Sequence, residues 1–183
     1  MSEEMIVRHC SPTLAGLKTG SLFRCPCKCP RQLREDIRRL NRRLAHKGIH
    51  FLPLKFDDKG ALIYVYRPKK LSEDLKNALA ESLLEMQGYV WQKPAQCIAK
   101  LAKRLSESGD FPHEIGLFLG YPPEDVHGFI HQGPHCCKCT GCWKVYGNEE
   151  EAQRTFARYN KCTQEYLRQL TKGNTIERLT VKV

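Results

Sequence analysis

The stretch IHFLPLKFDDKGALIYVYRP, residues 49–68, decides the fold expected for this chain. Two apolar runs rich in aromatic and branched side chains flank DDKG, a turn sequence that ends in glycine. Residues 49–67 are therefore predicted to form a β-hairpin. Helical patterns stand on both sides of it, so strands and helices share the chain.

Helices are predicted through most of the chain after the hairpin. Ser72 is expected to cap a helix that ends at Gly88. Its buried stripe is expected to be Leu75, Leu79, Leu83 and Met86. Asn148 is expected to cap the longest helix, which Gly173 ends. Further helices are predicted at residues 95–108, 113–120 and 123–132, and strands at residues 142–147 and 175–183.

These elements predict an α+β fold. A chain of 183 residues with 41% hydrophobic residues can bury a substantial core. We predict a single domain over residues 1–183, with a small mixed sheet, several amphipathic helices and Cys-rich loops near residues 24–30 and 132–142. No segment approaches the ~20 apolar residues of a membrane span, and the acidic start lacks a signal segment. A cytoplasmic protein without a membrane span is expected.

The net charge of +10 predicts a surface that attracts anions. Much of the excess lies in the helix expected from Arg31 to Lys47, whose apolar stripe is Leu33, Ile37, Leu40 and Leu44. The candidate anion-binding residues on its exposed rows are Arg38, Arg39, Arg42 and Arg43. The helix presents either a solvated basic face or a surface for an anionic ligand or nucleic acid, although no finger spacing or stacking-aromatic motif accompanies it.

Ten cysteines in a reducing compartment favour metal or redox chemistry over a disulfide framework. They include two dense groups, CPCKC at residues 25–29 and HCCKCTGC at residues 135–142. Thiolates two or three positions apart can close on one tetrahedral ion, and C-x2-C-x2-C matches the first three ligands of a bacterial ferredoxin run. The candidate metal ligands are Cys25, Cys27, Cys29, Cys136, Cys139, Cys142 and His135. The expected cofactor is zinc or an iron–sulfur cluster.

The spacing of these thiols is compatible with several ligand sets. Tyr146 stands where the ferredoxin run has its fourth cysteine, so a fourth ligand must come from elsewhere. The two groups can share one ion, bind separately or be solvent-exposed thiols without metal. Glu124, His127 and His131 fall on one helical face and can extend the second group, although surface histidines are the commoner explanation. Other cysteines inside helical patterns, expected to be buried, are Cys97 and Cys162.

The N-terminal segment HCSPTLAGLK supplies a candidate catalytic pair, Cys10 and His9. A cysteine near basic groups can be a nucleophilic thiolate, and Lys18 can stabilise it. Adjacent residues of a strand point to opposite faces, so His9 is not automatically the base for Cys10. His113 with Glu114 is an alternative base and orienting group.

The stretches HCSPTLAGLKTGSLF, FPHEIGLFLGYPPEDVHGFI and CWKVYG, followed by the helix with FARYNKC, resemble a family of bacterial proteins of unknown function, number 3793. The family occurs largely in anaerobic Firmicutes such as clostridia, and the resemblance spans nearly the whole chain. The residues in matching motif positions are His9, Cys10, Lys18, Glu114, Gly120, Tyr121, Pro122, Asp125, Gly128, Trp143, Lys144 and Tyr146.

The resemblance implies a cytoplasmic protein of an anaerobe and carries no established activity. Association of such genes with flavodoxin and iron-handling genes implies a redox partner such as a flavodoxin. The family tends to have an aromatic residue where Cys142 stands, and dense cysteine groups are not general in it. The resemblance therefore implies that the common function lies at Cys10 or the EIGLFLGYP region and that the thiol groups serve a subgroup.

Three functions from different classes follow. The first is metal or iron–sulfur binding through thiolates, in redox or metal handling, because it accounts best for the ten cysteines. One alternative is a thiol-dependent enzyme that uses Cys10. The other is a nucleic-acid-binding module that uses the basic helix of residues 31–47.

Overall fold

The structure is a computed structural model that describes residues 1–107 and 111–182. The chain divides into two compact units: the first comprises Met1–Lys69 and Tyr159–Val183, and the second comprises Lys70–Arg158. Helices accompany one three-stranded and one two-stranded antiparallel sheet among the described residues, which confirms the α+β class. One domain over residues 1–183 stays a prediction.

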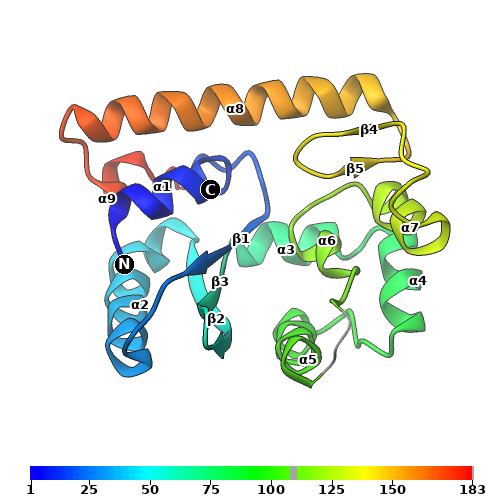
Figure 1. Ribbon diagram of the computed structural model, residues 1–183, viewed down its shortest axis with the longest axis horizontal. Helices are drawn as coiled ribbons and strands as arrows, with labels where there is room; N and C mark the ends of the chain where they lie inside the picture. The colour runs from blue at the N-terminus through cyan, green and yellow to red at the C-terminus, as the bar shows by residue number, and fades with distance from the viewer. Residues whose placement is uncertain (108–110, 183) are drawn as a thin grey trace. The chain divides into compact units, whose positions relative to one another are not determined.

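The predicted hairpin forms two strands of the three-stranded sheet in the first unit (Figure 1). β2 (His50–Asp57) and β3 (Gly60–Tyr66) pair antiparallel, and β1 (Gly20–Cys25) pairs with the other side of β3. β3 is buried almost throughout because it is the central strand, whereas Pro53 lies in the edge strand β2, where proline is tolerated. A mixed sheet was expected, but all described strand pairs are antiparallel.

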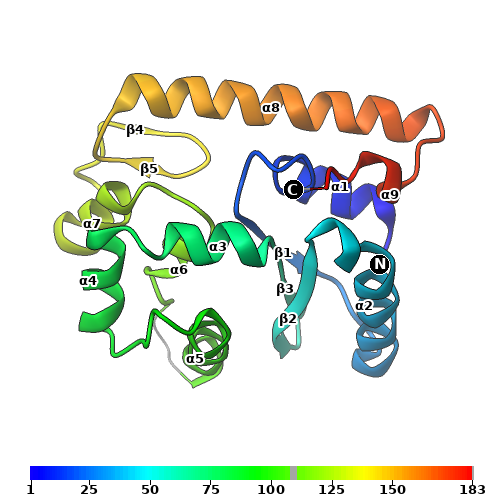
Figure 2. The ribbon, with the colours of Figure 1, turned by 180° about the vertical axis from the view of Figure 1, so that it is seen from behind.

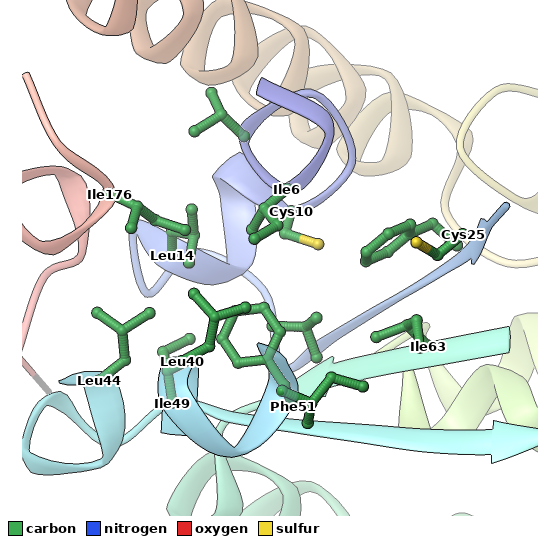
Figure 3. Close-up of a cluster of buried hydrophobic side chains, with 14 of the residues drawn as sticks. Ile6, Cys10, Leu14, Cys25, Leu40, Leu44, Ile49, Phe51, Ile63 and Ile176 are labelled. Atoms are coloured by element: carbon green, nitrogen blue, oxygen red, sulfur yellow. The ribbon is translucent and has the colours of Figure 1, made fainter. Parts of the chain in front are cut away.

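Helices α1 (Glu3–Leu14) and α2 (Pro30–Leu44) share one hydrophobic core with this sheet (Figure 3). Alternate residues of β3 face that core, as a strand requires: Ala61, Ile63 and Val65. The predicted stripe of the basic helix is confirmed as buried: Leu33, Ile37, Leu40 and Leu44. A short 3-10 turn η1 (Ala45–Lys47) follows, and Gly48 ends it with a φ of 73°.

The prediction of a last strand at residues 175–183 is wrong for the described residues, because helix α9 (Ile176–Leu179) occupies this segment. Val183 lies outside the described residues. The segment docks on α1 instead of a sheet edge: the Glu3 carboxylate accepts from the Ile176 N–H at 3.0 Å, and the Val181 N–H donates to the Leu14 carbonyl at 3.0 Å. Ile176 is fully buried in the core of the first unit.

The second unit contains α4 (Ala78–Met86), α5 (Pro94–Glu107), α6 (Ile115–Phe118) and α7 (Pro123–Gln132), followed by a hairpin of β4 (Cys139–Thr140) and β5 (Lys144–Val145) (Figure 2). α3 (Pro68–Asp74) leads into it. The helices predicted at residues 95–108, 113–120 and 123–132 and the strand predicted at 142–147 are confirmed, with Ser108 outside the described residues.

The single helix predicted from Ser72 is interrupted. α3 ends at Asp74, and the Asn77 side chain caps α4 by accepting from two following backbone N–H groups at 3.0 and 3.3 Å. The break changes the phase of the apolar stripe. The buried residues of α4 are Ala80, Leu83 and Leu84. Met86, expected inside, is 68% exposed.

The longest helix, α8 (Glu149–Thr171), begins as predicted. The Asn148 side chain accepts from the Glu151 N–H at 3.1 Å, and acidic residues occupy the first turn, where the helix dipole favours them. Its first residues belong to the second unit and the rest to the first. Within the described residues, no helix carries an apolar stretch long enough to cross a membrane.

Candidate functional site

The first cysteine group lines a groove in the first unit. Cys25 is the last residue of β1, Cys27 lies in the irregular segment that follows, and Cys29 occupies the N-cap position of α2. All three line one cavity of about 260 Å³ together with Met5 of α1. Met1 lines it as well, so five sulfur-containing residues border the same space.

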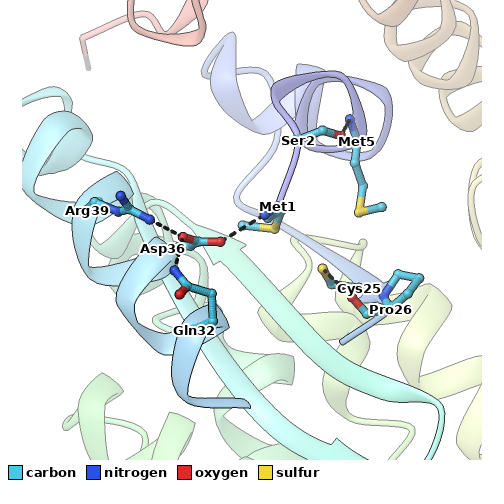
Figure 4. Close-up of polar contacts among 8 residues, drawn as sticks. All are labelled: Met1, Ser2, Met5, Cys25, Pro26, Gln32, Asp36 and Arg39. Carbon is cyan, nitrogen blue, oxygen red and sulfur yellow. Dashed lines mark hydrogen bonds and ion pairs between the residues drawn. The ribbon is translucent and has the colours of Figure 1, made fainter. Parts of the chain in front are cut away.

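Figure 4 shows Met1, Met5 and Cys25 with Asp36 of α2, whose carboxylate accepts from the Met1 ammonium; all four residues line the groove. The N-terminal ammonium, 3.1 Å from the Asp36 carboxylate, and the Arg39 guanidinium lower the pKa of Asp36 to about 2. Burial raises the pKa of the Cys25 thiol; the ammonium opposes this shift, and Cys27 and Asp36 add to it. Cys25 thus keeps its proton near neutral pH unless a cation replaces it.

The groove gathers the thiols without placing them as ligands. Within residues 1–107 and 111–182, no three His, Cys, Asp or Glu side chains are arranged to hold a metal ion. Residues 26–28 belong to no helix or strand, so their side chains can turn toward an ion without breaking a strand ladder or a helix.

The second cysteine group lies on and before the β4–β5 hairpin of the second unit. Cys136 and Cys142 are exposed, as is His135. Cys137, which the spacing argument passed over, is half-buried, and its Sγ lies 4.0 Å from Lys144 Nζ. These side chains are spread along a loop and hairpin rather than gathered around one point.

Local electrostatics disfavour a thiolate at Cys139. Partial burial raises the pKa of its thiol, and the neighbouring Glu149 carboxylate raises it further. The Lys138 ammonium donates to the Gly147 carbonyl at 2.6 Å. The two cysteine groups belong to different units, and an ion shared between them stays a prediction.

The histidines of α7 share a face, as their spacing predicted. The rings of His127 and His131 stack with centroids 4.0 Å apart, and His131 Nδ1 lies 2.9 Å from the His127 carbonyl oxygen. Of the helical cysteines, Cys97 is buried as predicted, while Cys162 is only partly buried.

Cys10 lies inside the core of the first unit, among aliphatic side chains (Figure 3). Burial raises the pKa of its thiol far above the ordinary value, and Lys18 and Ser21 offset only part of that shift. His9 is exposed and stacks on Phe23 with ring centroids 5.2 Å apart. A buried, protonated thiol is inaccessible to substrate, so this geometry gives the thiol-enzyme alternative no support.

We expect Cys10 to react with iodoacetamide only when the protein unfolds, because the thiolate is the nucleophile and burial both protonates and shields it. Residue-by-residue mass spectrometry after labelling near neutral pH, with and without urea, measures this. Exposed Cys136, which lies outside the groove of the first cysteine group, is the internal control and should label in the native protein. Labelling of native Cys10 at the rate of Cys136 would contradict the prediction and restore Cys10 as a candidate nucleophile.

The four arginines proposed for anion binding on α2 fall into two pairs. Arg39 and Arg43 form ion pairs with acidic side chains of the first unit. Their partners are Asp36, Glu3 and Glu177. Arg38 and Arg42 are exposed and line a shallow groove. The acids partly neutralise the basic face, which weakens its attraction for polyanions.

Arg67, at the end of the hairpin, is a buried residue that sequence reasoning missed. It is 2% exposed, and its guanidinium donates to four backbone carbonyls. The acceptors are Thr13 and Leu14 at 2.7 Å each, Val181 at 2.8 Å and Lys47 at 3.1 Å. Carbonyls at helix ends lack intrahelical partners, so one buried cation satisfies the ends of α1 and η1 and the C-terminal segment.

The EIGLFLGYP and WKVYG stretches meet in the second unit around a cavity of about 350 Å³. Tyr121 and Trp143 stack there with ring centroids 5.0 Å apart, and Phe129 of α7 adds a third aromatic wall. Two basic side chains, His113 and Lys144, line the same cavity.

Asp125 of α7 fixes this arrangement. Its carboxylate is 3% exposed; Oδ2 accepts from Trp143 Nε1 at 2.6 Å, and Oδ1 accepts from the Tyr146 and Gly147 N–H groups at 2.7 Å each. Gly128 lets α7 approach closely, since a Cβ there would lie 2.3 Å from Cγ of Tyr146. The family resemblance named Asp125, Gly128, Trp143 and Tyr146 as motif positions, and the packing of the second unit shows what each side chain contacts.

Glu114 does not orient His113 as proposed. Its buried carboxylate pairs with Arg104 at 2.8 Å and accepts from the Tyr89 hydroxyl at 2.7 Å. The His113 ring packs edge-on against Phe129, with centroids 4.7 Å apart. Glu114 therefore ties the EIGLFLGYP stretch to α5 instead of serving a base.

These features define an α+β protein with a sulfur-lined groove in one unit and an aromatic cavity in the other. A family model described as "Protein of unknown function (DUF3793)" matches residues 6–180, and the chain belongs to this family. The family predicted from the sequence motifs is thereby confirmed. No curated protein and no solved structure matches the chain.

Proposed function

We propose that the first unit binds a thiophilic metal ion through Cys25, Cys27 and Cys29, in metal or redox handling. The observation that supports this proposal is that the three thiols line one groove with the thioether of Met5. Thiolate and thioether sulfur are soft ligands, which suit copper(I), zinc and iron–sulfur clusters.

Met5 favours copper(I) among these. Zinc takes its ligands from thiolates, imidazoles and carboxylates, whereas a neutral thioether suits a soft monovalent ion. The groove holds three cysteines, one short of the four thiolates that a common iron–sulfur cluster takes. Three thiolates beside a thioether therefore suit copper(I) best.

Binding must displace the proton of Cys25, whose pKa burial raises. The apparent affinity should consequently rise with pH, because proton release accompanies metal binding.

We expect protein purified without oxygen to bind copper(I) in competition with a chromophoric chelator. The double variant Cys27→Ser/Cys29→Ser should lose at least about 100-fold in affinity, since even outer-shell partners of a metal contribute about 10–100-fold. Met5→Leu should weaken copper(I) binding and leave zinc binding unchanged.

The matched control is Cys136→Ser/Cys142→Ser, which also removes two cysteines but lies in the second unit. It should retain wild-type affinity. Equal affinity of the wild type and Cys27→Ser/Cys29→Ser would overturn the proposal, and a loss confined to the control would place the ion at the β4–β5 hairpin instead.

An anionic ligand or nucleic acid on α2 is a second candidate, favoured by the exposed Arg38 and Arg42. It ranks lower because acids engage Arg39 and Arg43. A cytoplasmic location and a redox partner such as a flavodoxin fit the proposed metal function and stay predictions.

A further inference from the structure

The aromatic cavity of the second unit has the size and walls of a small-molecule site. Its volume of about 350 Å³ lies within the range of ligand pockets, about 300–1,000 Å³. Tyr121, Trp143 and Phe129 supply flat apolar surfaces, and Phe111 lines the same cavity. Such walls suit a planar ring that stacks on aromatic side chains.

The walls are held in place before any ligand arrives. Asp125 accepts from the Trp143 indole, Tyr121 stacks on its face, and Phe156 meets its edge with ring centroids 4.5 Å apart. The Tyr121 hydroxyl in turn donates to the Cys142 carbonyl at 3.2 Å. A preformed site binds more tightly because little side-chain freedom is lost on association.

The polar side of the cavity favours a negative charge. Lys144 and His113 line it, and the only acid among its described lining residues, Asp125, already accepts three hydrogen bonds. The 4.0 Å contact between Lys144 Nζ and Cys137 Sγ is a weak one, which leaves the ammonium able to bind an anionic oxygen.

We propose that this cavity binds a small planar aromatic molecule that carries an anionic group, with the ring packed against the Tyr121, Trp143 and Phe129 side chains and the anion at Lys144. All of its lining residues belong to the second unit, so the site is separate from the proposed metal groove. The two proposals are therefore tested independently. A negative copper-binding result does not affect the ligand proposal, and a negative ligand titration does not affect the metal proposal.

Two tryptophans provide the reporter and its control. Trp143 lines the cavity, whereas the Trp91 indole donates to Glu85 at 3.0 Å and lies outside it. In ¹⁵N-labelled protein their two indole N–H signals can be followed by NMR during titration with 2-naphthoate or with the neutral 2-naphthamide. We expect 2-naphthoate to shift the Trp143 signal saturably, to leave Trp91 unmoved and to bind about tenfold more tightly than the amide, as one charge-assisted hydrogen bond allows.

Lys144→Met keeps the length of the side chain and removes its charge. It should abolish the preference for naphthoate over naphthamide, with both still moving the Trp143 signal. Lys103→Met, at an exposed lysine of α5, should keep the preference. The proposal is overturned if neither probe shifts Trp143 saturably, if both tryptophans shift together, or if Lys144→Met retains the wild-type preference.

Discussion

Replacing Arg67 by methionine is expected to lower the free energy of unfolding by at least about 3 kcal/mol. The guanidinium donates to four backbone carbonyls of the first unit, and a hydrogen bond to a charged group contributes about 1.5–3 kcal/mol. The Thr13 and Leu14 carbonyls keep a backbone N–H partner, so the loss comes from the two buried charge-assisted hydrogen bonds to them rather than from unpaired acceptors. Methionine fills much of the space of the side-chain stem, so lost packing contributes less. Urea denaturation followed by far-ultraviolet circular dichroism measures the change.

Arg38→Met is the control for this variant, because it makes the same substitution at an exposed position of α2. Its effect should stay within about 0.5 kcal/mol. The loss of stability in Arg67→Lys should lie between those of Arg67→Met and Arg38→Met, since an ammonium has three donors and lacks the planar fork of the guanidinium. Equal transition midpoints for Arg67→Met and Arg38→Met would contradict the role given to Arg67.

Replacing Asp125 in the second unit by alanine is also expected to lower the free energy of unfolding by at least about 3 kcal/mol. Three donors lose their shared acceptor, and a buried donor left unpaired costs about 1–3 kcal/mol. The Trp143 indole also loses the bond that orients it in the cavity. Urea denaturation followed by tryptophan fluorescence measures the stability, and the indole N–H signal of Trp143 reports its changed environment.

Two further variants separate charge from hydrogen bonding. Glu150→Ala removes an equal charge from a side chain that is 82% exposed and should change stability by less than about 0.5 kcal/mol. Asp125→Asn keeps one acceptor oxygen for the Tyr146 and Gly147 amides but can turn an NH₂ group toward Trp143, so an intermediate loss is expected. An unchanged midpoint and an unmoved Trp143 signal in Asp125→Ala would show that Asp125 is not the organising group.

Arg67 and Asp125 solve the same physical problem with opposite charges. Arg67 is a buried cation that collects carbonyls where helices and the C-terminal segment end. Asp125 is a buried anion that collects N–H groups of the loop after β5 and of the Trp143 indole. Each charge joins segments that neither a helix nor a strand ladder connects, so a fully satisfied polar network holds these segments together.

The thiol-rich groove shows where pattern reading reaches its limit. The CPCKC spacing identified three candidate ligands, and their meeting at one groove follows from a short segment of chain. Met5 has no sequence signal that links it to them, because α1 reaches the groove only through packing on the sheet. For Cys10 the sequence neighbours His9 and Lys18 suggested reactivity, whereas α1 turns Cys10 into the core and His9 outward.

The sequence by itself determined the elements whose causes are local. The hairpin at residues 49–67, the apolar stripe of α2 and the Asn148 cap of α8 all depend on residues within a few positions of one another, so periodicity and capping chemistry predict them. The family, too, could be recognised from motifs in the sequence and is confirmed over residues 6–180.

Only the tertiary structure decided the rest. β1 is a strand because β3 offers it an edge, and the segment from Ile176 is a helix because it docks on α1. Arg67 meets the carbonyl of Val181, 114 positions away in the chain. Such contacts depend on which elements the topology brings together. A side chain's own neighbours in sequence carry no information about that, so burial, charge pairing and the composition of both candidate sites emerged only from the packed chain.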